Sequence, residues 1–216
     1  MTAANSEVLL VRQPIFDHEQ RVVGYELLGS GAASDLNLMA EDDSGELILS
    51  VYTTLSEHGE EKRVPGFVTI PESMILNDQL PQLPARQVVM QVHSAEATRP
   101  QLAERVRSLV ADGYRIAIQV DRLTKSIVTL LDAVQIARVD VSTKDAAEIA
   151  KWVKVLRGHK VAVMAVQIAS MDQLGECIEA GCKLFEGSFL SKPKVVKGRK
   201  INANEVALMQ LIQSLQ

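Results

Sequence analysis

Residues 115–141 read RIAIQVDRLTKSIVTLLDAVQIARVDV, and this stretch decides the fold class. Two apolar runs, Arg115–Val120 and Ile136–Val141, flank a segment of helical period at Lys125–Leu131. Short runs rich in Ile and Val predict buried strands, and a helix between two of them returns the chain to the same sheet edge. The stretch therefore predicts a parallel β-α-β unit.

The same alternation extends over most of the chain. Further strands are predicted at Val8–Phe16, Arg21–Leu28, Gly66–Ile70, Val88–Val92, Lys160–Val166 and Lys183–Glu186. Further helices are predicted at Gly45–His58, Pro100–Asp112, Asp145–Leu156, Met171–Ala180 and Asn204–Leu215. The turn at His18-Glu19-Gln20 is too short for a crossover, so the first two strands should form an antiparallel hairpin.

These elements predict an α/β fold, a (β/α)8 TIM-like barrel with an antiparallel first strand. A doubly wound open sheet is the alternative, and the lack of a Gly-rich phosphate loop after any predicted strand disfavours it. Helix-end signals support the boundaries. Capping-box spacing occurs at Asp43-x-x-Glu46 and Ser170-x-x-Gln173, and Gly113 and Gly181 follow helices as C-terminal caps would.

Composition excludes several classes of protein. The 216 residues are 47% hydrophobic and 23% charged, which is a globular balance, and the net charge is −4. Neither a basic stretch for nucleic acid nor an apolar run for a membrane is present, and MTAANSEVLL lacks the pattern of a signal peptide. We therefore expect a cytoplasmic protein. Cys177 and Cys182 are then expected as free core thiols, with a disulfide or part of a metal site as alternatives.

Three sets of motifs carry a family resemblance. The first is VRQPIFD at 11–17 with VVGYELL at 22–28, and the last is GCKLFEGSFLSKP at 181–193. They resemble the opening and closing motifs of EAL domains, with Glu-Leu-Leu in place of Glu-Ala-Leu. Between them, 113–118 and 134–140 match strands that carry Asp-Asp-Phe-Gly and Lys-Ile-Asp in that family. The resemblance covers nearly the whole chain and implies an EAL-type barrel of cyclic-di-GMP signalling.

The chain is most similar to the EAL half of proteins that continue into an HDOD domain. In those proteins a basic linker leads into a helix that opens the second domain, and Lys194–Lys200 followed by Asn204–Leu215 resembles this junction. We therefore predict a degenerate EAL barrel at residues 1–193. Residues 194–216 are predicted to form a basic linker and a C-terminal helix that would open a following HDOD domain.

The resemblance also implies where a site would lie. EAL enzymes cleave a phosphodiester with metal-activated water, and two divalent cations need several carboxylate ligands at the C-terminal ends of barrel strands. The matching positions here are Gln13, Glu26, Ser30, Thr69, Gln91, Ser94, Gln119, Val120, Arg138, Asp140, Val166, Ala169 and Glu186. Only Glu26 and Asp140, with Asp121 if the register slips by one, keep family carboxylates. Arg138 would place a fixed cation beside any bound ion.

The resemblance then implies a non-catalytic signalling domain, not an enzyme, with no metal or other cofactor. Its expected partner is another protein, an adjacent HDOD domain or a second copy of the chain. Cyclic-di-GMP is not expected as a ligand, because Ser30 replaces an arginine that would bind phosphate. The alternatives are a cyclic-di-GMP receptor that does not hydrolyse it, a weak residual phosphodiesterase, and an unrelated α/β enzyme.

Two ion pairs are also predicted. Glu26 is expected to be buried and held by Arg138 or Arg12, and Asp140 to pair with Arg138 or Arg115.

Overall fold

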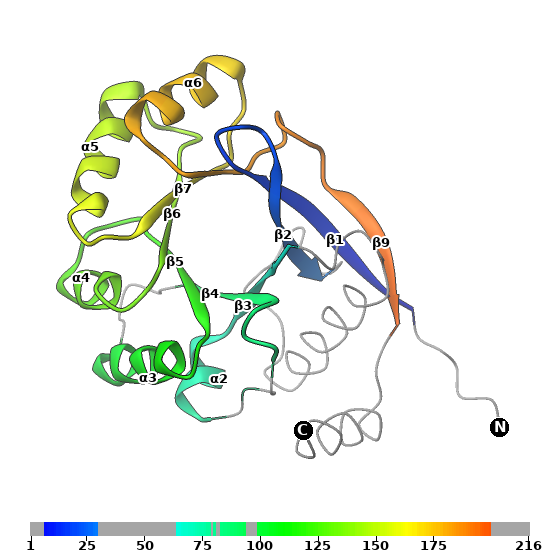
Figure 1. Cartoon of the computed structure of the whole chain (residues 1–216), viewed down its shortest axis with the longest axis vertical. Helices are drawn as coiled ribbons and strands as arrows, with labels where there is room; N and C mark the ends of the chain where they lie inside the picture. The colour runs from blue at the N-terminus through cyan, green and yellow to red at the C-terminus, as the bar shows by residue number, and fades with distance from the viewer. Residues whose placement is uncertain (1–6, 30–63, 79, 81–82, 94–98, 200–216) are drawn as a thin grey trace.

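The structure is a computed structural model that describes residues 7–29, 64–78, 80, 83–93 and 99–199. Its strands form one sheet in the order β2-β3-β4-β5-β6-β7-β8-β1-β9, and an additional β1–β2 pairing closes the sheet. Figure 1 shows the strands as a ring with helices α2 to α6 outside it. The predicted α/β barrel is confirmed.

The elements follow the predicted alternation. The strands are β1 (Glu7–Phe16), β2 (Val22–Gly29), β3 (Gly66–Ile70), β4 (Val88–Val92), β5 (Arg115–Gln119), β6 (Ile136–Asp140), β7 (Ala162–Val166), β8 (Leu184–Phe185) and β9 (Lys194–Arg199). The helices are α2 (Glu72–Leu76), α3 (Pro100–Ala111), α4 (Lys125–Leu131), α5 (Ala146–Arg157) and α6 (Met171–Ala180). β2 to β8 pair in parallel, whereas β1 pairs with β2 in the antiparallel sense, as predicted.

The antiparallel first strand results from a tight turn. The Asp17 carboxylate accepts hydrogen bonds from the backbone N–H groups of Glu19 and Arg21, each at 2.9 Å. Such side-chain acceptors stabilise short turns without any added secondary structure. Gln20 takes up the left-handed backbone conformation that the turn requires, with φ of 61°.

The helix ends follow the local signals in most respects. Ser170 Oγ accepts the Gln173 N–H at 3.2 Å, but the Gln173 side chain accepts the Ala169 N–H and not that of Ser170, so this predicted capping box is half formed. A complete box, not predicted, joins Asp145 and Glu148 at the start of α5. The predicted C-terminal glycines at 113 and 181 are confirmed by φ angles of 93° and 97°.

Two elements differ from the sequence predictions. The short helix α2 follows β3 and was not predicted. The segment predicted as a basic linker begins with β9, which pairs with β1 from Arg12↔Lys194 to Glu7↔Arg199. The predicted helices at 45–58 and 204–215 and the capping box at 43–46 lie outside the described residues. None of the described helices has the length and apolar character needed to cross a membrane.

Alternating side chains divide the core into two clusters. Outward-facing strand residues pack against the helices in the larger cluster. Inward-facing residues form a second cluster, here called the inner apolar layer, made of Ile15, Phe67, Val89, Ala117, Ile136, Met164 and Val166. Gly24 belongs to this packing, because a Cβ there would lie 2.7 Å from the Phe67 ring.

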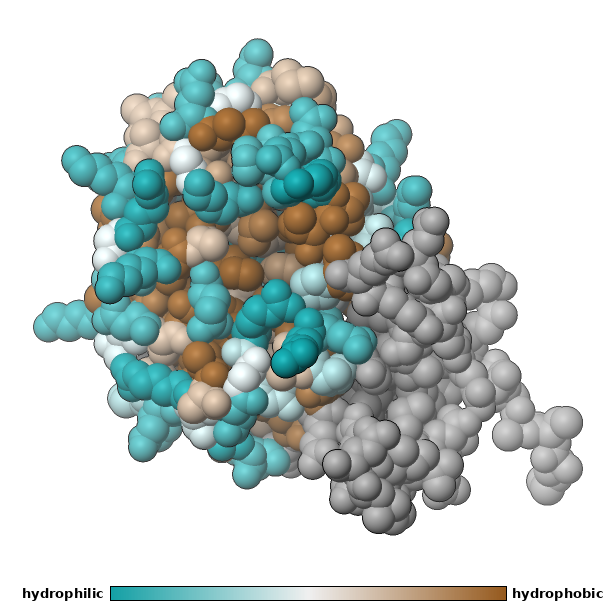
Figure 2. Space-filling model, viewed as in Figure 1, coloured by the Kyte–Doolittle hydropathy of each residue, from teal (hydrophilic) through white to brown (hydrophobic). Residues whose placement is uncertain are grey.

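Figure 2 shows hydrophilic side chains projecting around the outline of the described part and hydrophobic ones between them.

Candidate functional site

A second set of inward-facing side chains lies next to the inner apolar layer, towards the C-terminal ends of the parallel strands. Successive inward positions on a strand are two residues apart, so Phe67 is followed by Thr69, Val89 by Gln91, and Ile136 by Arg138. β1 runs in the opposite direction, which places Gln13 in register with Glu26 of β2. We call this set the polar layer. Its members are Gln13, Glu26, Thr69, Gln91, Arg138 and Glu186.

Arg138 is the centre of the polar layer. Its Nη2 lies 2.7 Å from Glu26 Oε1 and 3.3 Å from Glu186 Oε2, and its Nη1 donates to Gln91 Oε1. Gln91 Nε2 in turn donates to Glu26 Oε1 at 3.0 Å. Arg138 is only 5% exposed and Glu26 only 6% exposed. One buried hydrogen-bonded network thus joins β2, β4 and β6 to the residue that follows β8.

The two buried carboxyl groups carry different charges. Burial raises the pKa of Glu186 to about 9, and the charge of Glu26 and a hydrogen bond to Glu26 add to this effect, against the opposing influence of Arg138. Burial also acts against ionisation of Glu26, but Arg138 and hydrogen bonds from Glu186 and Gln91 overcome it and lower its pKa. At neutral pH Glu186 is therefore protonated, and Glu26 balances the charge of Arg138.

A pair of divalent cations does not fit the described residues of this layer. Its two carboxyl groups, Glu26 and Glu186, share a guanidinium that already supplies the compensating charge. Within the described ranges, no three His, Cys, Asp or Glu side chains come together as a metal site would require. Hard cations prefer several anionic oxygen ligands, and here one positive side chain stands among them.

One predicted ion pair is present and the other is not. Glu26 pairs with Arg138, the first of its two predicted partners, whereas Arg12 lies over the Tyr25 ring at 4.5 Å from its centroid. Asp140 was expected to pair with Arg138 or Arg115. Its carboxylate instead accepts the Ser142 N–H at 2.8 Å, because the Arg138 guanidinium is turned towards Glu26.

Most other predicted positions lie at the rim of the network. Gln119 Nε2 donates to Asp121 Oδ1 at 3.1 Å, and Val120 is buried. Val166 belongs to the inner apolar layer, while Ala169 is exposed just beyond it. Pairing of β5 with β6 places Gln119 beside Arg138, but its side chain bonds Asp121, whereas Val166 and Ala169 contribute no polar group to the network. Ser30 and Ser94 lie outside the described residues.

Three polar atoms of the layer are buried without a hydrogen-bond partner among the described residues: Gln13 Oε1, Thr69 Oγ1 and Arg138 Nε. Gln13 Nε2, in contrast, donates two hydrogen bonds, to the Gly187 carbonyl at 3.2 Å and to the Ser191 carbonyl at 2.6 Å. Gln13 thereby ties β1 to the segment after β8. Its side-chain oxygen and the Thr69 hydroxyl retain unused hydrogen-bonding capacity inside the barrel.

Sequence reasoning missed two features of the site. It placed Glu186 at a family position but did not predict that Glu186 shares a network with Glu26. The signal for that network was a second inward-facing carboxyl group near an inward-facing arginine. It also did not identify a hollow on the outer face of α5, which Leu123, Glu148, Lys151, Trp152 and Val155 line.

Comparison with known proteins supports the resemblance to EAL domains. No family model matches the chain. The cyclic di-GMP phosphodiesterase CdgJ of Vibrio cholerae is 25% identical over 211 residues, covering 95% of this chain and 49% of that protein. The uncharacterised protein YuxH of Bacillus subtilis is 22% identical over 219 residues, covering 96% of this chain and 53% of that protein. The chain thus spans about half the length of these curated relatives.

A solved structure gives the same fold. The standalone EAL protein from Vibrio cholerae O395, in its c-di-GMP-bound form, superposes with a TM-score of 0.67 at 17% identity, covering 89% of this chain and 94% of that one. At this identity the likeness establishes the fold, an EAL-type barrel.

These findings correct one prediction. The chain was predicted not to be an enzyme, because carboxylates are missing from the matching positions. That prediction is wrong in the light of a relative named as a phosphodiesterase that aligns with 95% of the chain. Replacement of residues at matching positions does not establish loss of activity.

Proposed function

We propose that this chain is a regulatory domain of cyclic-di-GMP signalling that acts through protein contacts, and that a second copy of the chain docks on the outer face of α5. The observation that carries the proposal is an exposed apolar hollow of about 250 Å³ on that face. The likeness to CdgJ supports the assignment to cyclic-di-GMP signalling.

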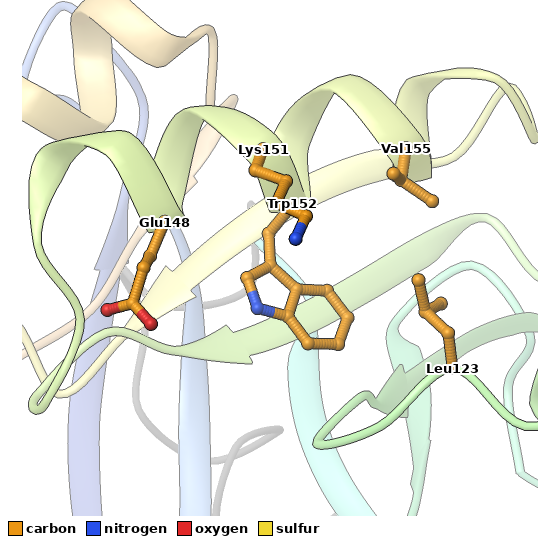
Figure 3. A pocket seen from close by; sticks show the side chains of 5 residues that line it. All are labelled: Leu123, Glu148, Lys151, Trp152 and Val155. Carbon is orange, nitrogen blue, oxygen red and sulfur yellow. The ribbon is translucent and has the colours of Figure 1, made fainter.

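The hollow has the composition of a protein contact. Trp152 and Val155 of α5 point towards Leu123, which lies in the loop before α4 (Figure 3). Leu123 is 41% exposed and Val155 is 39% exposed, so apolar surface is left open to solvent. Tryptophan is enriched among the residues that dominate binding energy at interfaces. Covering this face with a protein partner would therefore remove apolar surface from water, which is favourable.

The charges beside the hollow favour a second copy as the occupant. Glu148 and Lys151 both line it and lie one helical turn apart on α5. In a two-fold symmetric contact each residue meets the same surface of its partner, so an acid and a base side by side can pair with their counterparts across the axis. A contact of this kind adds charge pairs around a buried tryptophan.

The oligomeric state tests the proposal. Analytical ultracentrifugation of the chain should show a dimer whose dissociation constant rises at least tenfold in Trp152→Ala. Met171→Ala is the matched control, because Met171 is 61% exposed on a different helix, and it should leave the dimer unchanged. A chain that stays monomeric at all concentrations, or a dimer indifferent to Trp152→Ala, contradicts the proposal.

A second candidate function is hydrolysis of cyclic-di-GMP, the activity for which CdgJ is named. One feature of the site favours it: Glu26 of β2 is retained and ionised, and hydrolysis would require metal ions to displace Arg138 from it. Hydrolysis and dimerisation are compatible with each other.

Turnover of cyclic-di-GMP with Mg²⁺ or Mn²⁺ tests this second candidate. Linear dinucleotide that accumulates with the chain and is abolished in Glu26→Gln supports it. A saturable binding isotherm without turnover indicates a receptor instead and contradicts it. The chain with Arg107→Met, a change on the exposed face of α3, is the control for non-specific loss.

A further inference from the structure

The C-terminal end of α6 brings two cysteines together. The Cys182 N–H donates to the Cys177 carbonyl at 3.0 Å, and the Gly181 N–H donates to the Ile178 carbonyl at 3.0 Å. With Gly181 in the left-handed conformation at φ of 97°, these bonds form a Schellman cap. In this cap the residues at the positions of Cys177 and Cys182 characteristically contact each other through their side chains.

The two cysteines are free thiols, and each shifts the pKa of the other. The Cys182 thiol donates a hydrogen bond to Cys177, which lowers the pKa of Cys177 despite the opposing effects of burial and of Glu176. The same hydrogen bond, followed by burial, raises the pKa of Cys182. The pair thus joins a thiol of lowered pKa to a thiol of raised pKa, and a lowered pKa favours the nucleophilic thiolate.

We propose that Cys177 and Cys182 form an oxidisable dithiol, an intramolecular modification site for hydroperoxides that fastens the end of α6 to the start of β8. The sequence contains only these two cysteines, so an intramolecular disulfide has a single possible pairing. This inference is independent of the proposed dimer and of hydrolysis.

A hydroperoxide is the only oxidant that the reaction requires. The Cys177 thiolate attacks one peroxide oxygen, the O–O bond breaks, and Cys177 becomes a sulfenic acid while the leaving hydroxide is protonated to water. The Cys182 sulfur then attacks the Cys177 sulfur, the S–S bond forms, and the sulfenic oxygen leaves as a second water with the proton of Cys182. Two thiols are oxidised and one hydroperoxide is reduced.

The reaction requires the cap to open. Cys177 is fully buried and Cys182 is 4% exposed. Both thiols pack in the larger core cluster, so the backbone bonds of the cap must break and the last turn of α6 must separate from that core. Helix ends open locally in this way at a lower free energy than the whole domain. Oxidation should therefore be slower than that of an exposed thiol, but should proceed in the folded chain.

Mass spectrometry tests the site. The reduced full chain is treated with hydrogen peroxide or diamide, unfolded in urea with an alkylating reagent, and weighed. The expected product has lost two hydrogen atoms, carries no alkyl group, remains a single chain on a non-reducing gel, and regains both thiols with dithiothreitol. A Cys177–Cys182 peptide after proteolysis identifies the bond.

Single-cysteine variants separate this result from indiscriminate oxidation. Cys182→Ser removes the resolving thiol, so its Cys177 should be trapped by dimedone as a sulfenic acid and no intramolecular disulfide can form. The proposal is overturned if both thiols of the native chain remain fully alkylatable under treatment that oxidises glutathione completely. Sulfinic acids or disulfide-linked dimers as the main products overturn it equally.

Discussion

The inner apolar layer and the polar layer lie next to each other inside one barrel, two residues apart on the same strands, yet different forces hold them. The apolar layer is a plug of side chains such as Met164 and Val89, both fully buried, whose stability comes from close packing. The polar layer depends on Arg138, whose charge is balanced by Glu26. An apolar layer therefore loses stability in proportion to the volume removed from it, whereas a buried charge requires its partner.

The largest effect should come from Arg138→Met in the polar layer. The substitution keeps apolar volume but leaves Glu26 buried without its cation, so the free energy of unfolding should fall by about 3–5 kcal/mol. Urea denaturation at pH 7 measures this loss. Arg107→Met, at an exposed position of α3, should stay within about 0.5 kcal/mol. An Arg138 variant as stable as that control would remove the distinction between the layers.

The next largest effect should come from Met164→Ala in the apolar layer. Removing a fully buried side chain leaves a cavity and should cost about 2–4 kcal/mol. The exposed Met171→Ala is the matched control and should cost less than about 0.5 kcal/mol. Unlike the polar-layer loss, this loss should be the same at pH 5 and pH 8, since no titrating group is involved. A strong pH dependence would show that the layers are coupled.

A third effect is the pH dependence of the free energy of unfolding, which should arise in the polar layer and not in the apolar one. In the folded chain the pKa of Glu186 is about 9, above its ordinary value, so its stabilising contribution is complete at low pH and declines as the pH rises towards 9. Glu186→Gln removes this decline. The stability of the variant relative to the native chain should increase by up to about 1.4 kcal/mol per pH unit between pH 5 and pH 8. Thermal unfolding across that range measures it, and parallel curves would contradict the assignment.

The smallest effect should come from Thr69→Val. The Thr69 hydroxyl is buried without a partner among the described residues, so an isosteric methyl group should leave stability unchanged or raise it by up to about 1 kcal/mol. Thr129→Val is the comparison, because that hydroxyl donates to the Lys125 carbonyl at 3.0 Å. If Thr69→Val proves clearly destabilising, the hydroxyl has a partner and the polar layer is more completely bonded than the described contacts show.

The barrel was predictable from the sequence because short, continuous stretches of the chain specify its strands and turns. Apolar runs such as 66–70 and 88–92 coincide with β3 and β4, and a short turn required the hairpin of β1 and β2. The strand β9 was missed because three of its six residues are basic and one is glycine, a composition that resembles a solvated linker. It becomes a strand only through pairing with β1. Tertiary contact overrides local composition at such edges.

The polar layer was only partly predictable. The sequence indicated that Glu26 needed a buried partner, and left Arg138 and Arg12 open. Choosing between them requires knowing which residues of β2 and β6 face inward at the same height, and this depends on register around the closed barrel. The proton held by Glu186 follows from burial beside Glu26, which no linear spacing shows.

A double-mutant cycle between Glu26 and Arg138 tests whether charge balance holds the polar layer together. Unfolding free energies of the native chain, Glu26→Gln, Arg138→Met and the double variant are measured at pH 7. Because Glu26→Gln removes the charge that Arg138 balances, the double variant should recover much of the Arg138→Met loss, with a coupling energy of at least about 2 kcal/mol. Losses that add to within about 0.5 kcal/mol would contradict internal charge balance in the polar layer.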